Sequence, residues 1–179
     1  MPRRYPRIDA WPQYWNTGIT ADEKFGTPSQ EIIPVPRPIF TVGGGNDSAI
    51  IVEILQITWD YYFGDVNAGR GFKASICTRS RAQQTEVVAE LNEPECFWRF
   101  QYICRNSTTD IVKGMMRKNT FDYTDDEGRG YLLAVDNIYI QIEGYDETDD
   151  NPELYIKLLY RFVRVPLREY IGIVQSQQT

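Results

Sequence analysis

The fold of this chain is decided by two apolar stretches, Tyr131-Leu-Leu-Ala-Val-Asp-Asn-Ile-Tyr-Ile-Gln-Ile-Glu143 and Leu154-Tyr-Ile-Lys-Leu-Leu-Tyr-Arg-Phe-Val-Arg-Val165. Both are rich in Ile, Leu, Val and Tyr and interleave polar residues, which is the pattern of a β-strand. A short acidic loop separates them. The tail that follows, Leu167–Thr179, is first apolar and then rich in glutamine. No periodicity assigns this tail an internal partner, so we expect it to be extended and to dock on a neighbouring subunit.

Upstream, alternation of apolar and polar residues predicts further strands. The longest, Ala49–Phe63, carries five apolar residues that we place on one face: Ile51, Leu55, Ile57, Trp59 and Tyr61. Further strands are predicted at Phe72–Arg79 and Cys96–Arg105, with weaker candidates at Ile39–Val42, Ile111–Lys118 and Thr120–Tyr123. The only predicted helix covers Gln83–Leu91 and is ended by Pro94.

This spacing predicts an all-β fold. About eight strands and one short helix without βαβ rhythm indicate an antiparallel jelly-roll sandwich with extended N- and C-terminal segments. The chain of 179 residues suits one domain. We divide it into an extended N-terminal arm (1–46), which is rich in proline and aromatic residues, a jelly-roll domain (47–165) and a C-terminal docking tail (166–179).

Composition excludes several classes of function. The absence of histidine removes the commonest general base, Ser/His and Cys/His nucleophiles and His-containing zinc sites. Carboxylate or lysine chemistry is not excluded, but no pair of carboxylates stands out from the surrounding loop acids as a glycosidase would need. We therefore expect no enzymatic activity and no cofactor. The three cysteines, Cys77, Cys96 and Cys104, lack a CxxC spacing and are interpreted as core thiols in a reducing compartment. No stretch approaches the ~18 apolar residues of a membrane span, so no membrane partner is expected.

Charge is unevenly distributed along the chain. The net charge is −6. Residues 1–118 carry 14 basic and 13 acidic side chains, whereas 119–179 carry 5 basic and 12 acidic ones. This balance excludes an overall basic nucleic-acid binder and leaves local basic patches as the alternative.

The C-terminal third resembles a known family. The stretches Asp125–Ile142, Lys157–Val165 and Glu169–Gln178 are similar to the C-terminal end of single jelly-roll capsid proteins. Those capsids belong to small circular single-stranded DNA viruses that encode a rolling-circle replication protein. The ending Tyr170-Ile-Gly-Ile-Val-Gln-Ser-Gln-Gln178 is the most distinctive part.

The resemblance implies a structural role. The chain would be a coat protein that self-assembles into a small icosahedral (T=1) shell of about 60 copies around a single-stranded DNA genome. It would reside in the virion, and in the host cytoplasm or nucleus during assembly. The family offers no catalytic residues to carry over. One departure is the short basic arm, since such capsid proteins commonly begin with a longer Arg/Lys-rich segment.

Candidate site residues follow from these patterns, each with an alternative left open. Genome contacts are predicted at Arg3, Arg4, Arg7, Arg79 and Arg81, although a solubilising terminus would explain the first three equally well. Subunit contacts are predicted at Trp11, Trp15, Tyr170, Ile171, Ile173 and Val174. Asp146, Asp149 and Asp150 offer oxygen ligands suited to a divalent cation such as calcium, against the simpler interpretation of a solvated loop.

A rival function is a monomeric jelly-roll module that binds carbohydrate or another ligand. It would use a tryptophan as a stacking platform, from the set Trp11, Trp15, Trp59 and Trp98, and would leave at least one of them exposed on a concave face. The aromatic strand beginning at Cys96 would likewise serve either as a base-stacking surface or, more commonly, as sandwich core.

Overall fold

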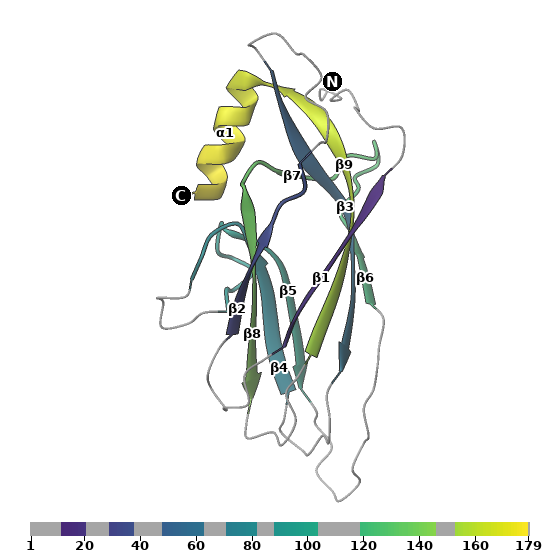
Figure 1. The fold of residues 1–179 in the computed structure, drawn as a ribbon, viewed down its shortest axis with the longest axis vertical. Coiled ribbons are helices and arrows are strands. Elements are labelled where there is room, and N and C mark those ends of the chain that lie inside the picture. The colour runs from purple at the N-terminus through teal and green to yellow at the C-terminus, as the bar shows by residue number, and fades with distance from the viewer. Residues whose placement is uncertain are drawn as a thin grey trace, which may run out of the picture.

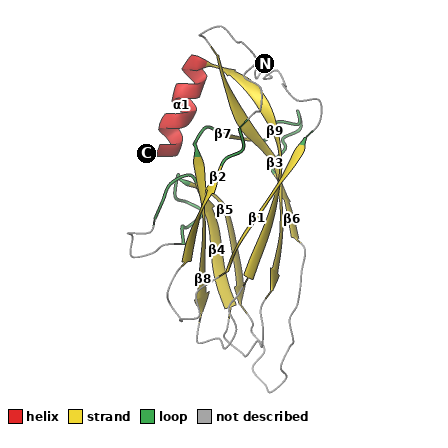
Figure 2. Ribbon diagram, in the orientation of Figure 1, coloured by secondary structure: helices red, strands yellow, loops and turns green. Residues whose placement is uncertain are grey.

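A computed structural model of the chain describes residues 12–20, 29–37, 48–62, 71–81, 88–103, 119–145 and 153–178 (Figure 1). In these segments, nine strands form two antiparallel sheets, and a single helix follows the last strand. The two sheets pack face to face as a sandwich (Figure 2). The described part is therefore mostly β, as the sequence predicts.

Sheet A has five strands, in the order β1-β9-β3-β6, with β7 also paired to β3. They span Gln13–Thr20 (β1), Ser48–Tyr62 (β3), Asn119–Asp122 (β6), Tyr131–Leu133 (β7) and Glu153–Pro166 (β9). Sheet B has the order β2-β8-β4-β5. Its strands span Ser29–Pro34 (β2), Gly71–Cys77 (β4), Cys96–Ile103 (β5) and Asn137–Tyr145 (β8). The predicted N-terminal arm thus contributes one strand to each sheet.

The core lies between the sheets and follows the period-2 pattern. On β8, Ile138, Ile140 and Ile142 are fully buried, and on β9 the alternate residues Leu154, Ile156 and Leu158 are buried to the same degree. Aromatic rings from β3, β4 and β5 complete the core, including the edge-to-face pair of Tyr61 on β3 and Phe72 on β4 at 5.4 Å. Burying each large apolar side chain contributes about 1.5–3 kcal/mol, so this layer is the main source of stability.

A β-bulge in β3 changes which residues face the core. The pairing of β3 with β9 shifts between Ile54 and Gln56, which leaves Leu55 as the extra residue. Because one inserted residue reverses the alternation, Ile54 and Ile57 both face the core. Ile51 lies on the opposite side of sheet A, in a second apolar cluster. The prediction that Ile51 shares a face with Ile57 is therefore wrong, since the sequence does not reveal the bulge.

A buried ion pair holds a loop against the same side of sheet A. Glu53 and Arg161 are directly opposite on β3 and β9, and Arg161 Nε donates to the Glu53 carboxylate. Arg161 also donates to Gly128 O at 2.7 Å, and Gly130 N donates to Glu53 Oε1 at 2.9 Å. A Cβ atom at Gly130 would lie 2.0 Å from Ile54 O. This close approach explains why glycine occupies that position.

The C-terminal segment is a helix, not an extended tail. Helix α1 spans Leu167–Gln178 and begins directly after β9 ends at Pro166. Proline cannot donate to a strand ladder, and Glu169 lies in the first helical turn, where a carboxylate is favourable. Among the described residues, no helix is both long and apolar enough to cross a bilayer.

Other predicted elements have mixed outcomes. The strands predicted at Ala49–Phe63, Phe72–Arg79, Cys96–Arg105, Thr120–Tyr123 and Leu154–Val165 are confirmed, as β3, β4, β5, β6 and β9. The single strand predicted over Tyr131–Glu143 is two strands, β7 and β8, separated at residues 134–136. Residues 88–91 of the predicted helix are not helical. The strand candidates at Ile39–Val42 and Ile111–Lys118 lie outside the described residues.

Candidate functional site: the outer face of sheet B and helix α1

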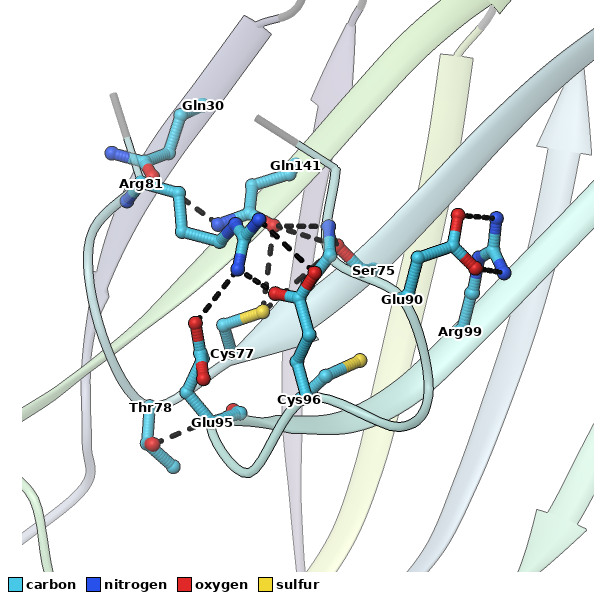
Figure 3. A network of polar contacts seen from close by, with 12 residues as sticks. Gln30, Ser75, Cys77, Thr78, Arg81, Glu90, Glu95, Cys96, Arg99 and Gln141 are labelled. Carbon is cyan, nitrogen blue, oxygen red and sulfur yellow. Dashed lines mark hydrogen bonds and ion pairs between the residues drawn. The ribbon is translucent and has the colours of Figure 1, made fainter. Parts of the chain in front are cut away.

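The outer face of sheet B carries polar side chains that are nevertheless buried. Ser75 on β4 and Gln141 on β8 are fully buried, and Ser75 Oγ donates to Gln141 Oε1 at 2.6 Å. The end of the β4–β5 connection that the structure describes from residue 88 onward lies against them, and Ala89 N donates to Ser75 Oγ at 3.0 Å. Gln141 Nε2 donates to Gln30 Oε1 on β2 at 3.3 Å (Figure 3). Because each polar group has a partner, the layer can be buried without a large desolvation cost.

Ion pairs hold the same connection in place. Arg81 is only 5% exposed, and its Nη1 donates to Glu95 Oε1 at 2.7 Å. Its Nη2 donates to Glu93 Oε1 at 3.2 Å, and its main-chain N donates to Gln30 Oε1 at 2.9 Å. On the β5 side, Arg99 Nη2 donates to Glu90 Oε1 at 2.7 Å. The connection is thus tied to β2 and β5 by charge-assisted hydrogen bonds.

This environment shifts the ionisation of Glu95. Burial raises its pKa, but hydrogen bonds from its own main chain and from Arg81, together with the positive charge of Arg81, outweigh burial. The pKa of Glu95 is therefore held below its usual range.

The predicted genome contacts Arg79 and Arg81 have different surroundings. Arg79 is exposed, whereas the guanidinium of Arg81 is occupied by Glu93 and Glu95. Arg3, Arg4 and Arg7 lie outside the described residues, so no contact of theirs is known. Of the two predicted genome contacts that lie within the described residues, Arg79 is the one with an exposed side chain.

Helix α1 is anchored to its own chain through one face. Tyr170 and Ile173 pack against Ile51, Val163 and Val165 of sheet A. By contrast, the predicted contact residue Ile171 is 48% exposed, and Val174 is half-buried. The helix therefore has an inward apolar face and an outward one, and the predicted contacts are divided between them.

Gln177 anchors the end of α1 by replacing a strand partner. Its Nε2 donates to Leu132 O at 2.6 Å, and its Oε1 accepts from Ala134 N at 3.0 Å. The side-chain amide thus satisfies a carbonyl and an N–H next to β7, as a neighbouring strand would. Thr78 Oγ1 donates to Gln177 O at 2.9 Å and connects the helix to the end of β4. Sequence reasoning missed Gln177 because a glutamine in a polar tail carries no signal of burial.

The predicted N-terminal contact Trp15 lies on β1 and is half-buried. Its ring meets Tyr160 edge-to-face at 6.5 Å. Beside it, Tyr14 is exposed and lies beneath Lys157 Nζ, 4.1 Å from the ring centroid. Trp11 lies outside the described residues.

The acidic residues do not form a metal centre within the described ranges. Asp146, Asp149 and Asp150 lie outside them, and no group of three or more metal-ligating side chains gathers among the residues inside. In the turn after β6, Asp125 accepts from Arg129 N at 2.8 Å and from Glu127 N at 3.0 Å. These main-chain donors keep the pKa of Asp125 low. Its carboxylate is satisfied without a cation.

Two of the three cysteines meet beneath the β4–β5 connection. Cys77 and Cys96 are directly opposite on β4 and β5, and both are buried free thiols. No sequence pattern indicated this pairing, because a long connection separates the two residues along the chain. Cys104 lies outside the described residues.

No family model matches this chain, and no curated protein matches it. Solved structures of similar fold include polyomavirus VP1 proteins. Human polyomavirus 6 VP1, solved as a pentamer, superposes with a TM-score of 0.54 at 11% identity over 92% of this chain and 98% of that one. Merkel cell polyomavirus VP1 in complex with GD1a oligosaccharide superposes with a TM-score of 0.54 at 9% sequence identity, over 91% of this chain and 98% of that one. Trichodysplasia spinulosa-associated polyomavirus VP1 in complex with GM1 oligosaccharide superposes with a TM-score of 0.54 at 9% sequence identity, over 90% of this chain and 98% of that one.

At this identity the comparison concerns the fold alone. The two sheets of the sandwich match those of VP1 over nearly the whole length of both chains. The predicted all-β jelly-roll class is therefore confirmed. The division into arm, domain and tail stays a prediction.

Proposed function

We propose that this chain is a viral capsid protein that self-assembles into a closed shell. The observation that carries the proposal is the extent of the fold match, which covers 92% of this chain and 98% of a VP1 chain. Two of the similar structures are described as VP1 pentamers, which supports self-association as the use of this fold.

The surface supports several contacts per subunit. Large apolar side chains are exposed on β1, β2, β6, β9, α1 and the β4–β5 connection: Tyr14, Ile32, Leu91, Phe121, Tyr155, Leu167 and Ile171. They are spread over different elements, as a shell requires, since each subunit must touch several neighbours. A stable contact buries roughly 1,000 Å² or more, of which such residues would form the centres.

The finer proposal follows the resemblance of the C-terminal third. It specifies an icosahedral shell of about 60 copies that encloses single-stranded DNA. Arg3, Arg4, Arg7 and Arg79 are the proposed genome contacts, while Arg81 has a structural role in its ion pairs. The chain would reside in the virion, with assembly in the host cytoplasm or nucleus. No residue is assigned a catalytic role.

A second candidate function is carbohydrate binding, because several of the similar VP1 structures are described as complexes with oligosaccharides. VP1 of Merkel cell polyomavirus is described in complex with 3'-sialyllactosamine as well as GD1a oligosaccharide. The described tryptophans do not favour a stacking platform here: Trp98 is 3% exposed, and Trp59 packs against it at 5.1 Å. A glycan array on the purified protein tests this function separately from assembly.

The decisive experiment is to measure the size of the purified protein. We expect size-exclusion chromatography with light scattering to give particles above 1 MDa, as about 60 copies of a 20.8 kDa chain require. Negative-stain microscopy should show round, closed shells. A species that remains at 20.8 kDa across protein concentration and salt would overturn the proposal.

A further inference from the structure

The register of sheet B places two thiols opposite each other. Cys77 is the last residue of β4 and Cys96 the first of β5, and the two are paired across the strands. The pairing shifts between Ile76 and Cys77, so that a bulge at Phe97 brings Cys96 into register. Without this bulge Phe97 would face Cys77.

The backbone geometry at this pair suits a cross-link. Cys96 N donates to Glu93 O at 3.0 Å, not to Cys77, whereas the next pair is bonded through Thr78 N and Glu95 O at 2.9 Å. Cys77 and Cys96 thus resemble a non-hydrogen-bonded antiparallel pair, in which the side chains are closest and Cα atoms are about 4.5 Å apart. A disulfide needs Cα atoms about 4.4–6.8 Å apart.

The side chains are also in contact. Cys77, Ala89 and Cys96 form a small buried cluster of their own. Cys77 is fully buried, and Cys96 is 8% exposed. Figure 3 shows both thiols beneath the β4–β5 connection, on the same side of sheet B. The strand pairing and the shared cluster therefore place the two thiols close together, and Cys77 Sγ donates to Gln141 Oε1 at 3.4 Å on the side facing β8.

We propose that Cys77 and Cys96 are a reversible disulfide latch that closes the base of the 78–95 connection under oxidising conditions. The oxidant is a small-molecule disulfide such as oxidised glutathione. The Cys96 thiolate attacks one sulfur of the oxidant, whose S–S bond breaks and releases one thiolate. Cys77 then loses its proton and attacks Cys96 Sγ in the resulting mixed disulfide, expelling the second thiol. Two cysteines are oxidised while one small disulfide is reduced to two thiols.

The surroundings favour Cys96 as the first nucleophile. The neighbouring Cys77 thiol lowers the pKa of the Cys96 thiol, and the positive charge of Arg99 acts in the same direction. The neighbouring Cys96 thiol, together with burial, raises the pKa of Cys77. Cys96 is also the more exposed of the two. Thiolate character and access therefore point to the same sulfur.

The disulfide would constrain the β4–β5 connection and helix α1 as well as the two strands that it joins. In the reduced protein, the connection is held by ion pairs of Arg81 and by the bond from Ala89 N to Ser75. Thr78, adjacent to Cys77, bonds the last turn of α1 through Gln177 O. A covalent bond at Cys77 would therefore fix the base of the connection and the support of α1 together. The inference does not depend on the proposed assembly.

The test uses the full chain and a Cys104→Ser variant, which retains both latch cysteines. Each protein is reduced, equilibrated with oxidised and reduced glutathione, alkylated and digested for mass spectrometry. We expect both proteins to yield a disulfide-linked peptide pair containing Cys77 and Cys96, which dithiothreitol removes. The oxidised form should melt about 5–10 °C higher than the reduced form.

The controls make the outcome decisive. Cys77→Ser should give no linked pair and no gain in melting temperature on oxidation. The inference is overturned if Cys77 and Cys96 remain alkylated as free thiols after equilibration with excess oxidised glutathione. It is also overturned if the only bonds found involve Cys104 or join two chains.

Discussion

The side-chain amide of Gln177 makes the two hydrogen bonds to the main chain that a neighbouring strand would otherwise make. Replacing it with alanine leaves Leu132 O and Ala134 N without their partner, so we expect Gln177→Ala to lower the free energy of unfolding by about 2–3 kcal/mol. Urea unfolding monitored by tryptophan fluorescence measures this difference. Arg168→Ala, at an exposed position of the same helix, is the matched control and should change stability by less than about 0.5 kcal/mol. Equal effects from the two variants would contradict the role of Gln177.

Glu95 makes stability depend on pH. The pKa of Glu95 is lower in the folded chain than in the unfolded chain. Ionised Glu95 therefore contributes to the free energy of unfolding at pH values above its pKa in the unfolded chain, which is about 4.3. This contribution is lost as pH falls through the lower folded value. We therefore expect wild type to be more stable than Glu95→Gln at pH 7 and the difference to shrink toward pH 3. Urea midpoints of both proteins from pH 7 to 3 measure this, and a constant difference would exclude the ion pair with Arg81 as the cause.

Helix α1 shows how one element can serve two purposes. Ile173 packs on sheet A, and we expect Ile173→Ala to destabilise the subunit by about 1–3 kcal/mol. Ile171 is exposed, so Ile171→Ala should change subunit stability by less than about 0.5 kcal/mol. If the outward face of α1 contacts a neighbour, as proposed, Ile171→Ala should still reduce particle yield. Unfolding curves and size-exclusion profiles of both variants separate the two effects, and unchanged particles would exclude Ile171 from the contact.

The same helix shows why element type could not be assigned from sequence. The apolar residues on either side of Gly172, which are Tyr170, Ile171, Ile173 and Val174, are β-branched or aromatic, a composition typical of strands. Their spacing, with Tyr170 and Ile173 three residues apart, also fits one face of a helix. Only the cluster formed by Ile51, Val163 and Val165 decides between these alternatives, since it offers that face a place to pack.

At the scale of the whole molecule, charge should oppose assembly. Each chain has a net charge of −6, so copies brought together repel one another. Raising salt shortens the screening length to about 3 Å at 1 M and should increase the yield of empty shells. Binding of single-stranded DNA should weaken over the same range, because the free-energy gain from releasing counterions shrinks as the bulk salt concentration rises.

Light scattering at a series of salt concentrations, with and without DNA, checks both directions. Empty particles that dissociate as salt rises would contradict an apolar interface and indicate one held by ion pairs. DNA binding that is unaffected by salt would contradict the proposed arginine contacts.

The sequence by itself determined the class of fold. Strands such as β8 and β9 alternate apolar and polar residues over a long distance, and a period of two is set by the backbone of each strand alone. The absence of histidine likewise limited the chemistry without any knowledge of the fold.

Tertiary structure decided the features that depend on residues far apart in sequence. The bulge at Leu55 moved Ile51 to the other face, and sheet B brought Cys77 to Cys96. Ser75 and Gln141 could be buried only because a distant connection satisfies them. Register and burial arise from contacts between separate segments, whereas local periodicity reports one segment at a time.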